Sequence, residues 1–318
     1  MKCISAVIAA GLANIVTAAP LPVLDVPAAL SNILANTHQS NLYTYPTDLT
    51  RGIVPKPIHS HNDYWRDVPF YSALSVGAVS VEGDVWLYND TLYVGHERSA
   101  LTEERTLQSL YIEPILDTLT RENPVSQFVI SPTKNGVYDV AGDQTLFFWV
   151  DIKTNGPTTL PYVIQALEPL RAGGWLTSVN ETGITWGPVT VIGTGNTPLS
   201  HVENVTSRDY FFDANLAKLD SDQSSVTHLI SPIASTDFEA SIGKVAGSSL
   251  NDTQLATLRQ QISDAHSKGI AVRYWNTPAW PITTRNGIWK QLIEEGVDLL
   301  NADDLAAAAG FSTQSRYW

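Results

Sequence analysis

The segment KPIHSHNDYWRDVPFYSALSVGAVSVEGDVWLYNDTLYVGH, residues 56–96, decides the fold. Its β-branched runs at Pro57–His61 and Val79–Trp86 are separated by a helix-length stretch, and Thr91–His96 follows as a hairpin partner. A strand, a short helix and a second strand of this kind form the unit from which parallel sheets are built. The segment therefore predicts an α/β fold with the strands in parallel.

The same alternation continues toward the C-terminal end and predicts eight strands in all. One helix between them is expected from Asn251 to Lys268, because an Asn cap followed three residues later by Gln favours a helix start. Another is expected near Asn286 to Glu295. A chain of this length suits a single TIM-type (β/α)8 barrel, which commonly needs about 250 residues, here over residues 56–318. The expected strands are Pro57–His61, Val79–Trp86, Phe147–Ile152, Val189–Gly193, Tyr210–Phe212, His228–Ile233, Ile270–Trp275 and Val297–Leu300.

Residues 1–19 have the pattern of a secretory signal peptide. A basic residue, Lys2, precedes the apolar stretch Ile4–Val16, which is too short to span a bilayer and leads into small residues before Pro20. We expect residues 20–55, which mix Pro, Ala, Asn and Thr, to form a leader packed on the barrel. The sequence thus predicts a secreted, extracellular protein.

Four Asn-x-Thr triplets are predicted glycosylation sites, because such triplets on exposed loops of secreted proteins accept N-linked glycans. They begin at Asn89, Asn180, Asn204 and Asn251.

The composition excludes several classes of protein. Cys3 is the only cysteine and lies in the segment predicted to be removed, so neither a disulfide framework nor a Cys-based metal site is expected. With 32 acidic and 19 basic residues and no basic block, the chain is a poor partner for nucleic acid. No obligate protein partner is evident.

Glu82 and Asp84 are two residues apart in an expected strand, so both side chains point to the same face. Their mutual repulsion is relieved by a hard cation such as Ca²⁺ or Mg²⁺, which prefers oxygen ligands. An isolated pair of this kind is equally compatible with solvated acids. The end of an apolar barrel strand is, however, where active sites of this fold lie, and His61 and His96 end neighbouring segments.

Two imidazoles beside a cation can serve as general base and general acid in turn, because each titrates near neutral pH. We assign these roles to His61 and His96. His59 offers an alternative, since His59 and His61 with a carboxylate could bind Zn²⁺. A third acid, Asp151, follows a buried run and is joined two residues later by Lys153, which we expect to face a phosphate oxygen while Asp151 binds the cation.

The order of these motifs resembles the phospholipase C-like phosphodiesterase superfamily. That superfamily includes phosphoinositide phospholipases C, glycerophosphodiester phosphodiesterases and sphingomyelinases D, and the layout here is most similar to the fungal altered-inheritance-of-mitochondria protein family. The matching segments are His61-Asn62-Asp63-Tyr64, Glu82-Gly83-Asp84 with Trp86, His96 after the hairpin, Asp151-Ile152-Lys153, Val272–Asn276 and Glu295–Asp303.

The resemblance implies a metal-dependent phosphoric diester hydrolase acting on phospholipids or other small phosphodiesters. It implies one divalent cation held by Glu82, Asp84, Asp151 and Asn62, with His61, His96 and Lys153 as catalytic residues. Substrate binding is expected from Lys153 and Trp275.

Trp275 and Trp280 could form an apolar rim for transient contact with a membrane surface, although core packing is expected for at least one of them.

Some features depart from individual branches of this superfamily. The glycerophosphodiesterase branch continues its first His with Arg-Gly, where this chain has Asn62-Asp63, and the toxin branch relies on disulfides. Glycerophosphodiesterase or sphingomyelinase D-like cleavage are thus alternatives to phospholipase C-like cleavage. From other classes, a secreted glycoside hydrolase would use two carboxylates but leave both histidines without a role, and a non-catalytic barrel could retain the cation site.

Overall fold

The computed structural model describes residues 30, 35, 45–131 and 133–314. The chain divides into two units, residues 1–45 and residues 46–318. The predicted signal peptide, residues 1–19, and most of the predicted leader, residues 20–55, lie outside the described residues. The barrel belongs to the second unit, and in the described part of the chain no helix is long and apolar enough to cross a membrane.

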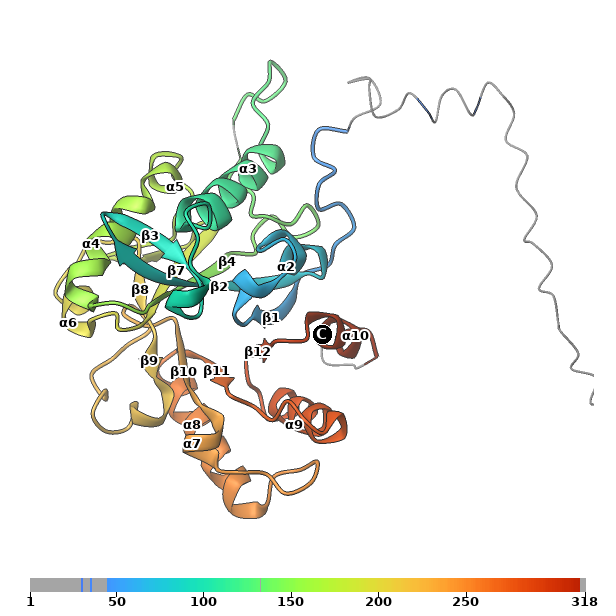
Figure 1. Cartoon of the computed structure of the whole chain (residues 1–318), viewed down its shortest axis with the longest axis vertical. Coiled ribbons are helices and arrows are strands. Elements are labelled where there is room, and N and C mark those ends of the chain that lie inside the picture. The colour runs from blue at the N-terminus through green and yellow to red at the C-terminus, as the bar shows by residue number, and fades with distance from the viewer. Residues whose placement is uncertain (1–29, 31–34, 36–44, 132, 315–318) are drawn as a thin grey trace, which may run out of the picture. The chain divides into compact units, whose positions relative to one another are not determined.

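The second unit is built on parallel strands that form a nearly closed barrel, which confirms the predicted fold class (Figure 1). Neighbouring strands follow the order β8-β7-β4-β2-β1-β12-β11-β10-β9, and β3 pairs with β2 in antiparallel fashion. The strands are β1 (Lys56–Ser60), β2 (Ala78–Tyr88), β3 (Thr91–Val94), β4 (Leu146–Ile152), β7 (Val189–Gly195), β8 (Phe211–Phe212), β9 (Ala214–Asn215), β10 (Ile233–Asp237), β11 (Ala271–Trp275) and β12 (Leu299–Ala302).

Only Asp213 separates β8 from β9, so these two short segments together occupy one position in the barrel. β8 pairs with β7, and β9 pairs with β10. The Asp213 carboxylate joins the two sides, since it accepts hydrogen bonds from the Thr194 hydroxyl and from the backbone amide and hydroxyl of Ser235. The two sides of the barrel are therefore joined at this position partly by a half-buried side chain.

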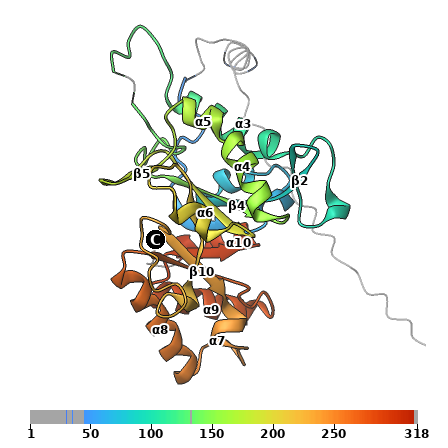
Figure 2. The same cartoon turned by 90° about the vertical axis from the view of Figure 1, so that its left-hand side faces the viewer.

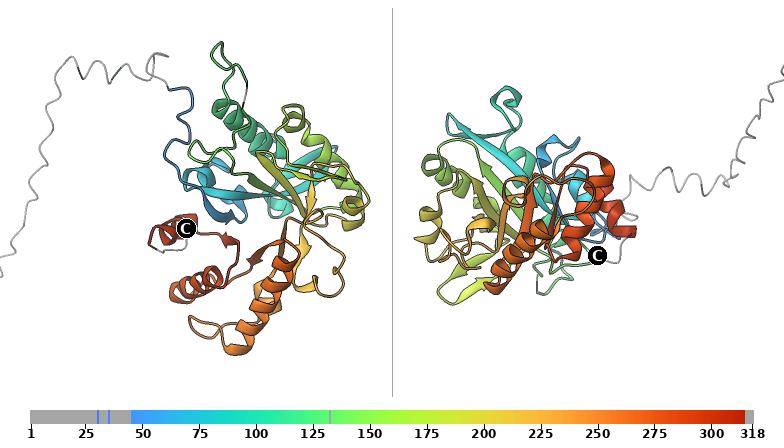
Figure 3. Two further views of the ribbon diagram at one scale, coloured as in Figure 1. Left: turned by 180° about the vertical axis from the view of Figure 1, so that it is seen from behind. Right: turned by 90° about the horizontal axis from the view of Figure 1, so that it is seen from below.

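Helices cover the outside of the strands (Figures 2 and 3). In the C-terminal half, α8 contacts β11, α9 contacts β12, and α10 contacts β1 and β12. The α-helices are α2 (Tyr71–Ser75), α3 (Glu113–Glu122), α4 (Gly156–Ala166), α5 (Glu168–Ala172), α6 (Leu199–Glu203), α7 (Phe238–Ile242), α8 (Asp252–Ser267), α9 (Ile282–Glu294) and α10 (Leu305–Gln314). Shorter helical turns are η2 (Asp63–Trp65), η3 (Arg98–Ala100), η4 (Gln108–Ile112) and η5 (Leu216–Lys218).

The strand β4 shows how the sequence divides core from site. Phe148, Val150 and Ile152 alternate along it and are buried, and the last two pack beside α4. The intervening Trp149 and Asp151 point into the barrel, because side chains alternate between the two faces of a strand. A run that is apolar almost throughout is typical of a strand covered on both faces.

The structure corrects the expected strand His228–Ile233. Residues 227–231 form a turn in which the amides of Ile230 and Ser231 bond to the Thr227 carbonyl, and the strand begins only at Ile233. Pro232 explains the shift, since it has no N–H to donate to a strand ladder.

Other boundaries moved less. The helix α8 begins after Asn251 with the expected capping arrangement, and α9 begins at Ile282 rather than near Asn286. A two-stranded hairpin of β5 (Ser178–Asn180) and β6 (Gly183–Thr185) was not expected, because three-residue strands carry too short a pattern to be recognised.

Candidate active site

A pocket of about 440 Å³ opens at the C-terminal ends of the barrel strands. Loops and strand ends from β1, β2, β4, β7, β11 and β12 all contribute to it. This is the end of the barrel at which the fold carries its active sites. The lining residues include His61, Asn62, Glu82, His96, Asp151, Lys153, Arg273, Trp275, Asn301 and Asp303.

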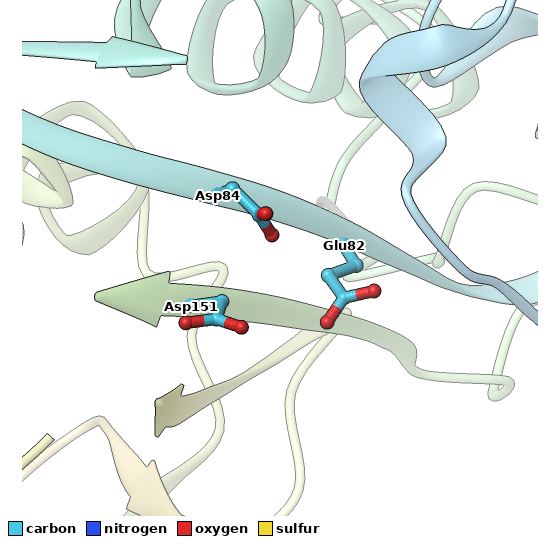
Figure 4. A group of neighbouring side chains, drawn as sticks. All are labelled: Glu82, Asp84 and Asp151. Atoms are coloured by element: carbon cyan, nitrogen blue, oxygen red, sulfur yellow. The ribbon is translucent and has the colours of Figure 1, made fainter. Parts of the chain in front are cut away.

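Three carboxylates form the centre of the site (Figure 4). Glu82 and Asp84 project from β2, and Asp151 projects from the neighbouring β4, where it lies in register with Asp84. One oxygen from each lies within 4.8 Å of the others. Gly195 at the end of β7 leaves room for this cluster, because a Cβ there would lie 2.0 Å from Oδ1 of Asp151.

The negative charges of the three carboxylates repel one another. Burial, with the nearby charges of Glu82 and Asp151, raises the pKa of Asp84 to about 6, and burial raises the pKa of Asp151. Oδ1 of Asp84 and Oδ1 of Asp151 are buried and accept no hydrogen bond from any described residue. Buried carboxylate oxygens without a donor suit a hard divalent cation, so the cluster could hold a metal.

Lys153 partly balances the charge of the cluster. Its Nζ lies 2.8 Å from Oδ2 of Asp151 and 3.0 Å from Oδ2 of Asp84. Burial opposes the charge of the ammonium, but these two carboxylates outweigh it and raise the pKa of Lys153. Lys153 therefore stays a cation within the pocket, with its charge directed at the two acids.

His59 lies beneath the pocket and is fully buried. Burial lowers the pKa of its imidazole to about 3, so the ring is neutral at physiological pH. Its Nε2 lies 3.4 Å from Oε2 of Glu82, and its Nδ1 lies 2.7 Å from Oγ of Ser80. A carboxylate only accepts, so Nε2 carries the hydrogen and Nδ1 accepts from Ser80. His59 thus supports Glu82 from below.

His61 lies above His59, at the rim of the pocket. Its Nδ1 lies 2.8 Å from Oδ1 of Asp303, and its Nε2 lies 3.9 Å from Oε2 of Glu82. Arg66 fixes this corner by donating to the carbonyls of His61 and Asp303. The carboxylate of Asp303 orients the imidazole so that Nε2 faces the acidic cluster.

Asn62 adopts a left-handed backbone conformation, with φ of 50°, which turns the chain immediately after His61. Its amide N–H donates to Oε2 of Glu82 at 3.1 Å, and its side-chain Oδ1 accepts from the Tyr64 hydroxyl at 2.5 Å. Asn62 is therefore next to the cluster, and its role as a cation ligand stays a prediction.

His96 lies beside Asp84, whereas His61 faces Glu82. Its Nδ1 lies 3.4 Å from Oδ2 of Asp84 and 3.0 Å from the Tyr64 hydroxyl, which also lies 2.7 Å from Oδ2 of Asp84. Half of the His96 side chain is exposed, and Trp65 packs beside its ring at 5.2 Å between centroids. The two histidines thus flank the acids, as the sequence predicts, and His96 is open to solvent.

Trp275 and Trp280 are both exposed, which contradicts the expectation that at least one packs in the core. Trp275 ends β11 on the pocket wall, and Trp280 is 76% exposed in the following loop. Trp275 is the last residue of β11 and Trp280 lies in the loop that follows, so both side chains remain at the surface at the open end of the barrel.

Sequence reasoning missed four residues of this site: Tyr64, Arg273, Asn301 and Asp303. Tyr64 and Arg273 stand inside segments that the sequence singled out, and inward alternation with Trp275 marks Arg273 as facing the barrel interior. Asn301 and Asp303 also lie in a singled-out segment, Glu295–Asp303, but the contact between Asp303 and His61 joins residues 242 apart in the chain and has no local signal.

All four glycosylation candidates are exposed: Asn89, Asn180, Asn204 and Asn251. Their modification stays a prediction.

Fold and site together define a TIM-type barrel with a buried acidic cluster flanked by two histidines. The chain belongs to the AIM6-like phosphodiesterase domain family, whose model matches residues 47–213. This confirms the phosphodiesterase superfamily that the motifs indicated, and it disfavours the glycoside hydrolase alternative.

Two relatives that are more than 30% identical support this placement. The altered inheritance of mitochondria protein 6 homolog of Arthroderma benhamiae is 53% identical over 94% of this chain and 97% of its own length. Altered inheritance of mitochondria protein 6 of Candida glabrata is 36% identical, over 83% of this chain and 72% of the relative. Among solved structures, a glycerophosphodiester phosphodiesterase from Parabacteroides distasonis matches with a TM-score of 0.44 and 12% identity, covering 83% of this chain and 100% of that one.

Proposed function

We propose that this protein is a secreted, metal-dependent phosphodiesterase that hydrolyses phospholipid-type phosphodiesters in a phospholipase C-like reaction. The observation that carries the proposal is the placement of His61 beside Glu82 and of His96 beside Asp84, in one pocket with the acidic cluster. Membership of a phosphodiesterase family supports the reaction type.

The cation is proposed to be Ca²⁺ or Mg²⁺, because the cluster offers only oxygen ligands. When bound, it polarises the phosphodiester and stabilises charge on its oxygens as the bond breaks. The Zn²⁺ alternative loses support from the geometry of His59, whose two nitrogens are already engaged by Ser80 and Glu82.

Each histidine has its Nδ1 within hydrogen-bonding distance of a neighbouring side chain, which leaves Nε2 available for proton transfer. Nδ1 of His61 bonds to Asp303, so its Nε2 can accept a proton from the attacking hydroxyl. Nδ1 of His96 lies next to Asp84 and Tyr64, so its Nε2 can give a proton to the leaving oxygen. When the attacking group is a hydroxyl of the substrate, the product is a cyclic phosphate that water opens in a second step. In that step His96 accepts the proton of the water and His61 gives its proton to the oxygen that leaves, so each ring returns to its starting state.

The substrate and the location of the protein are part of the same proposal. Trp275 lies on the pocket wall and Trp280 is exposed in the loop that follows it, and we propose that both contact a membrane surface transiently, since aromatic side chains favour such interfaces. Secretion is supported by the pattern of residues 1–19 and by four exposed Asn-x-Thr sites.

The proposal is tested by measuring the phosphate-containing product released from a panel of phospholipids, with and without a chelator. The expected result is release that stops with the chelator and returns when Mg²⁺ or Ca²⁺ is added in excess. A His96→Gln variant serves as a control for contaminating activity, because it retains the acidic cluster. Release that is undiminished in the variant or in excess chelator would contradict the proposal.

A further inference from the structure

Arg273 on β11 places a buried cation at the base of the pocket. Its side chain lies two residues below the exposed Trp275 and lines the pocket, although the residue is only 3% exposed. Its Nη1 donates to Oδ1 of Asn301 at 3.2 Å, and its Nη2 lies 3.5 Å from Oγ of Ser235. The Nε of Arg273 is buried and has no hydrogen-bond partner among the described residues.

The surroundings of Arg273 differ from those of Lys153, the other permanent cation of the pocket. Lys153 has two carboxylate partners, at 2.8 and 3.0 Å. No carboxylate oxygen in the described part of the chain lies within 4.0 Å of the Arg273 guanidinium. The Asp213 carboxylate balances part of this charge from a distance, through Ser235, whose hydroxyl donates to it. No acid pairs directly with the guanidinium, so it can still pair with an anion that enters the pocket.

Trp149 contacts the guanidinium of Arg273 without occupying the N–H groups of that guanidinium. The Cζ atom of Arg273 lies 4.2 Å from the centroid of the Trp149 ring. Such a cation–π contact engages the flat face of the guanidinium, whereas its N–H groups point outward in the plane. The fork of N–H groups matches the oxygens of a phosphate, which makes Arg suited to binding that group.

We propose that Arg273 binds the nonbridging oxygens of the substrate phosphodiester, with Asn301 and Trp149 fixing the plane of its guanidinium. In the order of barrel strands, β11 lies opposite β4, so the phosphate group is bound between Arg273 and the acidic cluster. The assignment rests on the proposed function. It also has an electrostatic consequence, because Arg273 lines the same pocket as the acidic cluster and its positive charge repels any cation bound there.

Two titrations of the full-length protein test this inference. Calorimetry measures the affinity for Mg²⁺, and ³¹P NMR measures the affinity for dimethyl phosphate in saturating Mg²⁺. The variants are Arg273→Met and Arg273→Lys. Arg259→Met is the matched control, because Arg259 is an exposed arginine that pairs with Glu295 on the outside of the barrel.

Arg273→Met is expected to bind dimethyl phosphate about tenfold or more weakly, since it loses charge-assisted hydrogen bonds, and to bind Mg²⁺ more tightly, since it loses a repelling charge. Arg273→Lys retains the positive charge but not the fork of N–H groups, so it should lower the affinity for dimethyl phosphate and leave the affinity for Mg²⁺ unchanged. Thermal unfolding shows whether each variant folds. If Arg273→Met does not fold, the affinity of Arg273→Lys for dimethyl phosphate tests the inference.

Three results would overturn the inference. Equal dimethyl phosphate affinity in the wild type and both Arg273 variants would remove Arg273 from phosphate binding and leave the proposed function intact. A parallel loss of Mg²⁺ and dimethyl phosphate affinity would indicate a structural role alone. If the wild-type protein binds Mg²⁺ but no dimethyl phosphate, the inference and the proposed function fail together.

Discussion

The two halves of the barrel rim supply opposite kinds of chemistry. β2 and β4 carry Glu82, Asp84 and Asp151, which concentrate negative charge on one wall. The opposite wall, from β11 and β12, carries Arg273 and Asn301, which offer hydrogen-bond donors and a cation. A phosphodiester in a metal-loaded site needs both, because its oxygens must contact positive charge on more than one side. Because the two walls belong to different strands, we expect substitutions in the acidic wall to leave the structure of the opposite wall intact.

Removing the acidic wall should have the largest effect. We expect Glu82→Ala and Asp84→Ala to leave no measurable hydrolysis, because each removes an oxygen ligand from the cation site. The loss should exceed the roughly 10- to 100-fold that removal of a supporting residue costs. Initial rates with and without chelator check this, with thermal unfolding as the control for folding. Undiminished activity in excess chelator would refute the assignment of the acidic wall.

The histidines between the walls should have the next largest effect. His61→Gln and His96→Gln should each lower kcat by about 10²- to 10⁴-fold, since each removes one proton transfer. The wild-type pH–rate profile should be bell-shaped, and each variant should lose one limb. A variant that keeps both limbs would show that the residue it lacks is not one of the two titrating groups.

His59 should affect the acidic wall indirectly. We expect His59→Gln to weaken cation binding by roughly 10- to 100-fold, because the neutral imidazole supports Glu82, and to retain most of kcat at saturating cation. Activity measured across a Mg²⁺ titration separates these two effects. If kcat collapses at saturating Mg²⁺ while His61→Gln remains active, the catalytic histidine is His59.

The smallest effect should come from pH. In the cation-free protein the pKa of Asp84 is raised to about 6, so this carboxyl group is protonated below that pH and must lose the proton before it binds a cation. Cation affinity should therefore be nearly constant above about pH 7 and fall by up to roughly tenfold per pH unit below pH 6. Calorimetric titrations at a series of pH values check the sign. Asp84→Asn should flatten this dependence.

The difference between the walls also explains what the sequence could reveal. The acidic wall is encoded by residues two apart in strands, Glu82 with Asp84 and Asp151 with Lys153, so strand alternation predicts their convergence. The barrel follows from repeated strand and helix patterns for the same reason. The opposite wall depends on a contact between distant residues, that of Arg273 with Trp149, and the same is true of the contact of His61 with Asp303. No local spacing in the sequence indicates either contact. The predicted boundary of a strand was wrong where a single residue overrides the β-strand pattern, as Pro232 does before β10.

The most direct test of the account is the position of the cation. A crystal of the protein soaked in Mn²⁺, a substitute for Mg²⁺ that can be located by its anomalous scattering, should show one ion bound by oxygens of Glu82, Asp84 and Asp151. The Arg273 side chain should not contact that ion. An ion bound instead by the nitrogens of His59 and His61, or an acidic cluster that binds none at saturating Mn²⁺, would contradict the account.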